Sequence, residues 1–263
     1  MSESIIGLVD WLDTPAGQYL LAWERARLEA AVVDIFGYHA LQLGFAQLDA
    51  LHTNRMPHRW LALDQAGQFQ QGASPRMDLA ADFCALPFAG SSLDLVVLPH
   101  TLEFSANPHA TLREVERVLV PEGRVVICGM NPTSLWGFKQ GRGRIFQRLG
   151  HGSLFLPEGG EFIGHWRLRD WLRLLSFEVE AAEFGCYRPA MRSEKWLQRF
   201  AWMDRAGARW WPILGAAYFV VAVKRVRGMR LLEPAWKAKP VRAGSSVSVA
   251  NSVSEYVNLE NED

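Results

Sequence analysis

The 263-residue sequence is poor in cysteine, carries no net charge and lacks a Cys-x-x-Cys spacing. Its three cysteines, Cys84, Cys128 and Cys186, are odd in number and far apart along the chain. We therefore expect neither a disulfide framework nor a bound metal. The 28 basic residues equal the 28 acidic ones, which argues against a protein that holds nucleic acid by bulk charge.

Long apolar runs and a leader pattern are also missing. Residues 1–9 contain no basic region and no extended apolar run, so we expect no secretory signal. The most apolar stretch, Trp210–Val223, is interrupted by Pro212 and Gly215. It is shorter than the roughly 18–20 residues that a membrane helix needs. These absences predict a cytoplasmic protein without a membrane span.

The apolar content is nevertheless high enough for a large core. Apolar residues make up 49% of the chain and charged residues 21%, which excludes a disordered tether. The length suits one domain of about 200–250 residues with an appendage. Seven short segments read as strands, several of them apolar throughout: 39–44, 59–64, 77–82, 93–98, 124–128, 177–182 and 216–223.

Helical patterns alternate with these strands. Thr14-Pro15 has the form of an N-cap followed by proline at the first helical position, and we expect this helix to run to about Ile35. Asn107-Pro108 begins a second helix in the same way, residues 167–175 form a third, and Pro121-Glu122-Gly123 predicts a turn. Strands that are apolar on both faces and alternate with helices predict an α/β fold: a mostly parallel seven-stranded sheet with helices on both faces.

The pattern also predicts the organisation of the chain. We expect an N-terminal helical segment, residues 1–36, that packs on a main domain at 37–230. Two insertions, 131–164 and 185–215, interrupt the strand–helix alternation, and we read the first as irregular. Residues 231–263 lack hydrophobic periodicity and are expected to be a disordered tail.

Candidate binding residues follow the strands, because ligands of open parallel sheets bind beyond the carboxyl ends of the strands. Gly44 ends the first predicted strand, and Asp64 lies 20 residues further on, a distance at which an acid can accept hydrogen bonds from ribose hydroxyls. Asp82 and Phe83 follow the third strand and could meet the amino group and the face of an adenine. Alternatively, both acids merely end a strand or cap a turn.

The fourth and fifth strands lead into further candidates. His100 and Glu103 follow the fourth strand and are the nearest residues that could act as a catalytic base. Asn131-Pro132 follows the fifth and could present an amide to a substrate. The structural alternatives are a packed or capping histidine, an acid with a structural role and a simple turn.

The stretch Asp82–Gly129 resembles the core of class I S-adenosylmethionine (SAM) dependent methyltransferases of the UbiE-like, small-molecule type. The motifs that carry the resemblance are Leu86-Pro87-Phe88, Leu93-Asp94-Leu95-Val96-Val97, His100, Leu102-Glu103, Arg117-Val118-Leu119 and Pro121-Glu122-Gly123. The continuous match covers about 50 residues, and the order of predicted strands extends it to roughly residues 1–228. The resemblance implies a Rossmann-like fold, SAM as the cofactor and methyl transfer as the reaction.

It also implies roles by position. Asp64 would bind the ribose of SAM, Asp82 and Phe83 would meet its adenine, and Leu98 and Pro99 would line its methionine arm. The family usually has Asp-x-Gly-x-Gly-x-Gly after the first strand, whereas residues 42–48 read Gln-Leu-Gly-Phe-Ala-Gln-Leu and keep only Gly44. A dinucleotide site fits less well, because Gly-x-Gly-x-x-Gly fails at both later positions.

The neutral charge hides an uneven distribution. Residues 1–135 hold 8 basic and 15 acidic groups, and residues 136–211 hold 13 and 8, together with seven of the eleven tryptophans. The members of this basic, aromatic set are Trp136, Trp166, Trp171, Trp196, Trp202, Trp210, Trp211, Arg142, Arg144, Arg148, Arg188, Arg192 and Arg199. As a lid it suits an apolar or anionic acceptor. Single-stranded RNA, or a cap with packed tryptophans and solvated arginines, are the alternatives.

Three functions remain open from the sequence. The favoured one is a SAM-dependent methyltransferase that acts on a small molecule. The second is a catalytically inactive protein with the methyltransferase fold that serves as a binding or regulatory module, which the glycine-poor loop suggests. The third is an RNA or protein methyltransferase, although the charge balance makes a nucleic-acid partner unlikely on physical grounds.

Overall fold

The computed structural model describes residues 11–64, 77–148, 154–156 and 160–226. The chain divides into two units, residues 1–226 and 227–263, and the described residues all belong to the first. The predicted tail at 231–263 lies outside them. None of the helices in the described ranges is long and apolar enough to cross a membrane.

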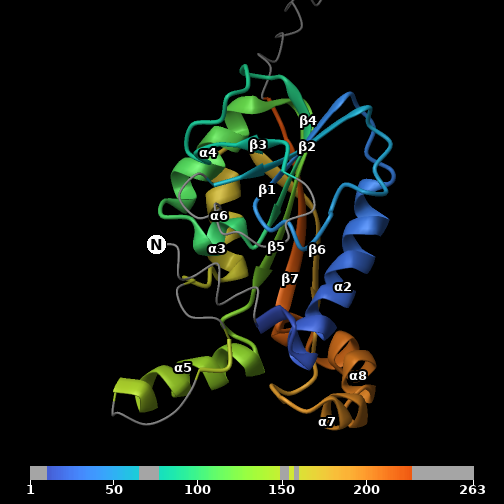
Figure 1. Ribbon diagram of the computed structural model, residues 1–263, viewed down its shortest axis with the longest axis vertical. Helices are drawn as coiled ribbons and strands as arrows, with labels where there is room; N and C mark the ends of the chain where they lie inside the picture. Colours follow the sequence, from blue (N-terminus) through green and yellow to red (C-terminus); the bar gives the residue numbers. More distant parts are fainter. Residues whose placement is uncertain (1–10, 65–76, 149–153, 157–159, 227–263) are drawn as a thin grey trace, which may run out of the picture. The chain divides into compact units, whose positions relative to one another are not determined.

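The first unit is built on one seven-stranded sheet (Figure 1). Its strands are β1 (His39–Leu43), β2 (His58–Leu63), β3 (Leu79–Ala80), β4 (Leu93–Pro99), β5 (Leu119–Met130), β6 (Phe177–Gly185) and β7 (Ala217–Lys224). The order across the sheet is β3-β2-β1-β4-β5-β7-β6. Strand β7 pairs antiparallel with both neighbours, whereas the other pairs are parallel. The predicted mostly parallel sheet of seven strands is confirmed.

Helices cover both faces of the sheet (Figure 1). They are α2 (Pro15–Val32), α3 (Thr101–Phe104), α4 (Pro108–Val118), α5 (Leu135–Arg148), α6 (His165–Leu174), α7 (Glu194–Arg199) and α8 (Trp202–Trp210), followed by the 3₁₀ turn η1 (Pro212–Leu214). Alternate side chains of β4 serve the two faces: Leu95 and Val97 pack in the core that includes α2, and Val96 and Leu98 in the core with α4 and α6. This alternation explains why β4 is apolar throughout.

Helix α2 begins as the sequence predicts and ends three residues early. Thr14 Oγ1 accepts a hydrogen bond from the N–H of Gly17 at 3.2 Å. The helix ends at Val32 rather than Ile35, because Asn54 Nδ2 donates to the carbonyl oxygens of both residues, at 2.7 Å and 3.1 Å. A buried side-chain amide therefore takes over the acceptors that would otherwise continue the helix.

Strand β3 is shorter than the predicted 77–82. The carboxylate of Asp78 accepts a hydrogen bond from the N–H of Leu61 on the neighbouring strand at 2.9 Å. After Ala80 the chain turns, and Asp82 Oδ1 accepts from the N–H of Cys84 at 2.8 Å. Asp82 therefore begins a turn instead of ending a strand.

Strand β5 contains the residues that were predicted to form a turn. Leu93 of β4 pairs with Leu119 of β5, and Leu95 pairs with Arg124. Between these two pairs β4 advances by two residues, whereas β5 advances by five. The extra residues bulge out, and Glu122 has a left-handed φ of 64°. The predicted turn is therefore wrong as a strand boundary: it is a bulge in a strand that begins at Leu119.

The two insertions are largely helical. Residues 131–164, which we expected to be irregular, contain the 14-residue helix α5. Its inner face is fixed by Trp136, whose Nε1 donates to the carbonyl of Arg188 at 2.7 Å, and by Gln140, whose side chain bonds to Leu156. Several glycines in this helix masked the pattern. The second insertion holds α7, α8 and η1.

Candidate functional site

The ends of three predicted strands meet at Gly44. Its φ of +73° lies in the left-handed region, and its N–H donates to the carbonyl of Ala62 at 2.7 Å. A Cβ placed on Gly44 would lie 3.5 Å from Thr101 Oγ1 and 3.7 Å from the ring of Phe83. The structure therefore brings Gly44, Phe83 and the start of α3 together at the carboxyl edge of the sheet.

The loop after β1 is organised around the buried amide of Gln42. Its Nε2 donates to the carbonyl oxygens of Gly44, Phe45 and Leu48, at 3.1, 3.0 and 2.7 Å. Its Oε1 accepts from the N–H of Ala50 at 2.9 Å. Three acceptors on one side and a donor on the other fix the orientation of this amide. A carboxylate, which can only accept, could not hold this loop.

The same loop holds Phe45 and Leu48, and of these two residues Leu48 departs from the family pattern. Phe45 has a φ of 54°, and its ring packs edge-on against that of His100, with centroids 5.6 Å apart. Leu48 is fully buried in the core and stands where the family has a glycine. Burial of Leu48 and the four bonds of Gln42 stabilise a loop of a different kind from a glycine-rich one.

The other predicted cofactor residues lie along the same edge. Asp64 directly follows β2 and is half-buried, whereas the carboxylate of Asp82 is exposed. Leu98 and Pro99 end β4 and are buried, with Leu98 in the core. The edge thus presents two carboxylates, an aromatic ring and a glycine, whereas the predicted methionine-arm residues lie beneath it.

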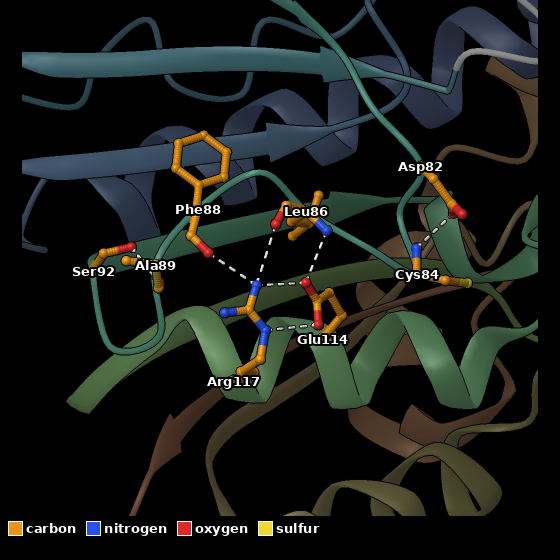
Figure 2. A network of polar contacts seen from close by, with 8 residues as sticks. All are labelled: Asp82, Cys84, Leu86, Phe88, Ala89, Ser92, Glu114 and Arg117. Carbon is orange, nitrogen blue, oxygen red and sulfur yellow. Dashed lines mark hydrogen bonds and ion pairs between the residues drawn. The ribbon is translucent and has the colours of Figure 1, made fainter.

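The Leu86-Pro87-Phe88 motif is held by helix α4 (Figure 2). Glu114 Oε1 accepts from the N–H of Leu86 at 2.8 Å. Arg117 bonds to both oxygens of Glu114 and donates to the carbonyls of Leu86 and Phe88, at 3.2 Å and 2.9 Å. The motif and the helix that follows it in sequence therefore form one clamp, and the clamp anchors the loop that carries Asp82 and Phe83.

We expect Arg117→Ala to lower the free energy of unfolding by about 1 kcal/mol, because the arginine is partly exposed and water compensates for some of its lost bonds. The bond from Arg117 holds the pKa of Glu114 below its ordinary value. Its contribution is therefore present above about pH 4.3 and disappears as the pH falls through the lowered pKa. Urea unfolding against pH measures this, with exposed Arg113→Ala on the same helix as the control. Equal effects of the two variants would contradict the clamp.

His100 lies between two buried carboxylates. Its Nε2 is 2.7 Å from Glu24 Oε1 on α2, and its Nδ1 is 2.9 Å from Glu103 Oε2. The other oxygen of Glu103 accepts from the backbone N–H of Met130 at the end of β5. All three side chains are almost inaccessible to solvent. The cluster Glu24–His100–Glu103 therefore ties α2, β4, α3 and β5 together next to Gly44.

The charges of this cluster determine the state of the imidazole. Burial by itself would lower the pKa of His100, but the charges of Glu24 and Glu103 outweigh it and raise that pKa to about 10. Carboxylates only accept hydrogen bonds, so both ring nitrogens carry a proton. Neither nitrogen then has a lone pair with which to accept a proton from a substrate.

Glu24 is a site residue that the sequence reading missed. It lies on the otherwise apolar buried stripe of α2, with Leu20 and Leu28 one turn to either side. A lone acid in such a stripe signals a buried partner, because an unpaired buried charge is costly. In the described part of the chain, Glu24 Oε2 has no hydrogen-bond partner.

A second polar cluster joins α2 to the predicted lid. The hydroxyl of Tyr19 donates to Asp204 on α8, and Arg188 Nε lies 2.9 Å from the same carboxylate. The guanidinium of Arg188 lies over the ring of Tyr19, 4.3 Å from its centroid. Asn131 Nδ2 donates to the carbonyls of Ile213 and Gly215, so this candidate residue holds the end of η1.

The sequence comparisons agree with the fold. Residues 43–127 match a family model described as a methyltransferase domain. Over 179 residues the chain is 33% identical to the uncharacterized protein YafS of Escherichia coli (strain K12), a match that covers 67% of this chain and 68% of YafS.

Solved structures of the same fold include several methyltransferases. The [4+2]-cyclase SpnF has a TM-score of 0.52 at 18% identity, covering 78% of this chain and 80% of that one. A possible histamine N-methyltransferase of Thermotoga maritima has 0.51 at 14%, covering 79% and 93%. A SAM-dependent methyltransferase of Archaeoglobus fulgidus has 0.51 at 16%, covering 78% and 94%. Identities this low establish the fold alone.

The chain has the class I methyltransferase fold, and residues 43–127 of it match a methyltransferase domain. By sequence, the chain belongs to the family of Escherichia coli YafS.

Proposed function

We propose that this protein is a methyltransferase of the UbiE-like type, which binds SAM at the Gly44 edge and methylates a small apolar or anionic acceptor. The observation that carries the proposal is the meeting of Gly44, Phe83 and Thr101 where the parallel strands end. Asp64 and Asp82 flank this point on the neighbouring strand ends. The methyltransferase domain match over residues 43–127 also supports it.

The residues at this edge fit a nucleoside-containing ligand. A Cβ on Gly44 would make only ordinary contacts with the Thr101 hydroxyl and the Phe83 ring, so the glycine leaves an open approach beside an aromatic face. Two carboxylates supply acceptors for hydroxyl and amino groups. A separate cavity of about 60 Å³ behind the loop, lined by Gln42 and Trp60 among others, is far smaller than a typical ligand pocket of roughly 300–1,000 Å³.

When bound, SAM supplies a methyl group that its positive sulfur already activates. The chain therefore has mainly to hold donor and acceptor in line and to exclude water. In our proposal Asp64 accepts hydrogen bonds from the ribose, Asp82 and Phe83 hold the adenine, and the insertions select the acceptor.

We further propose that His100 and Glu103 act as positioning residues. The left-handed backbone of His100, with a φ of 54°, places Thr101 so that its hydroxyl donates to the carbonyl of Leu43, next to Gly44. Two carboxylates keep the imidazole in place. The fixed imidazole holds the end of β4 beside the end of β1, its neighbour in the sheet. A proton released by the methylated molecule would then pass to another group or to water.

The proposal predicts that Asp64→Ala weakens SAM binding about 10- to 100-fold, because a carboxylate that accepts charge-assisted hydrogen bonds contributes roughly 1.5–3 kcal/mol. Asp82→Ala should weaken it about tenfold on the same grounds. Asp34→Ala is the matched control, since this exposed acid lies between α2 and β1, at the amino edge of the sheet. Isothermal calorimetry measures all three. Wild-type affinity in Asp64→Ala would rule out the assigned ribose site.

A further inference from the structure

Helix α5 presents an outward face that is both apolar and basic. Leu135, Phe138, Ile145 and Phe146 are each at least half exposed. Phe138 lies three residues after Leu135, Ile145 lies seven after Phe138 and Phe146 lies eight after Phe138, so all share one side of the helix, and exposed Arg142 lies among them. This stretch of the helix has no acid; two of its basic residues, Lys139 and Arg144, donate to carbonyls of the described chain, which leaves Arg142 as the basic residue of the outward face. Because Trp136 and Gln140 anchor the opposite face, this face is not available to the core of the described chain.

The segment from α7 to η1 carries a second face of the same character. Trp196, Trp202 and Trp210 are 50%, 60% and 74% exposed. The guanidinium of Arg199 lies 5.7 Å from the ring centroid of Trp196. Trp202 and exposed Arg205 are three residues apart on α8, so they share its outward side. Tryptophan next to arginine thus recurs along this segment.

The two faces lie at one end of the molecule. Figure 1 shows α5 and the α7–α8 pair beyond the carboxyl ends of the parallel strands. They are linked through the chain that precedes α7, because Trp136 donates to the carbonyl of Arg188 and Lys139 Nζ to that of Ala190. Within the described part of the first unit, the end that carries the candidate site is therefore also the end with these exposed apolar side chains.

The chemistry of these faces favours a lipid surface as the occupant. Tryptophan and arginine side chains suit the boundary between headgroups and acyl chains, and exposed aliphatic and aromatic side chains can enter it. Arg142 on α5, a helix without acids, and Arg205 on α8 complement anionic headgroups. A second copy of the same face would bring Arg142 toward its own like charge. Leu135 and Ile145 cannot stack on nucleobases, which disfavours single-stranded nucleic acid.

We propose that the outward faces of α5 and of α7–η1 dock on anionic phospholipid membranes, with Phe138, Ile145 and Trp202 at the acyl boundary and Arg142 and Arg205 among the headgroups. The docking brings the candidate site to the membrane surface. It goes beyond the proposed methyl transfer and does not depend on it.

Co-sedimentation with vesicles tests this proposal. We expect the full chain to bind vesicles that mix phosphatidylglycerol with phosphatidylcholine at low salt, and to be released at high salt. Arg142→Glu and the double variant Phe138→Ser/Ile145→Ser should each bind the vesicles more weakly than the wild type, by a factor of roughly ten or more. Phe36→Ser, 72% exposed before β1 at the amino edge, should bind as wild type. Thermal unfolding confirms that each variant is folded.

Three results would overturn the proposal. The first is no binding to anionic vesicles, whether or not the chain self-associates in light scattering or binds RNA. The second is equal binding to pure phosphatidylcholine vesicles. The third is wild-type binding by both folded α5 variants. SAM titration of the same samples separates these results from failure of the proposed function, because donor binding and vesicle binding are measured independently.

Discussion

Glu24→Ala is expected to lower the free energy of unfolding by about 3 kcal/mol, since it leaves the Nε2 N–H of a buried, charged imidazole without an acceptor. His100 would keep only Glu103, and a cavity would open beside α2. Glu29→Ala is the matched control, because this glutamate lies on the same helix and is about half exposed, so its loss should cost less than about 1 kcal/mol. Chemical denaturation of both variants measures the difference.

The pH dependence of stability tests the same cluster. The pKa of His100 is about 10 in the folded chain and about 6.5 in an unfolded one. Its contribution is therefore fully present below about pH 6.5 and is lost as the pH rises toward 10. The free energy of unfolding should fall over this window by up to about 1.4 kcal/mol per pH unit.

Glu24→Gln should flatten this slope, because it keeps an acceptor for His100 and removes one of the two charges that raise the pKa of the imidazole. Glu24→Gln is therefore expected to change how steeply the free energy of unfolding depends on pH, even if its value at neutral pH changes little. An unchanged slope in this variant would show that His100 is not held as an imidazolium.

Gln42→Glu is expected to lower the free energy of unfolding by about 3 kcal/mol or more, although it moves the sequence toward the acid that the family usually has there. A carboxylate would face the carbonyl oxygens of Gly44, Phe45 and Leu48, which are all acceptors. Several buried acceptors would lose their donor at once. Thermal and urea unfolding measure the loss.

The exposed Gln47→Glu in the same loop controls for the charge, because it introduces the same group outside the core. It should change stability by less than about 0.5 kcal/mol. If Gln42→Glu were as stable as the wild type, the loop would not depend on the amide, and the proposed organisation around Gln42 would be wrong. The loop also carries Gly44, so we expect Gln42→Glu to weaken SAM binding along with stability.

Local signals in the sequence predicted most of the fold. The Thr14-Pro15 and Asn107-Pro108 caps mark the starts of α2 and α4. The apolar run of β4 is predictable because both of its faces are buried by helices. The bulge at Glu122 was not, since Pro-Glu-Gly has turn chemistry locally, and only the pairing of Leu119 and Arg124 with β4 keeps it within a strand.

The candidate site divides in the same way. Positions that follow from strand ends, such as Gly44 and Phe83, could be read from the sequence and lie together in the structure. The role of His100 could not, because its partner Glu24 is 76 residues away and only the docking of α2 brings them together. In the sequence, Gln42 is recognisable only as a replacement of the acid that the family usually has. Its role in holding the loop depends on backbone carbonyls whose positions the local sequence does not encode.

The most direct test of the central claim is calorimetric titration of S-adenosylhomocysteine into the wild-type protein. This compound is what remains of SAM after methyl transfer. Its binding requires no acceptor, so the unknown substrate does not enter the measurement. The assigned site predicts saturable binding of one ligand per chain, weakened about 10- to 100-fold in Asp64→Ala and unchanged in Asp34→Ala. Absence of binding at millimolar concentration, for this ligand and for SAM, would contradict a donor site at the Gly44 edge and remove methyl transfer as the function.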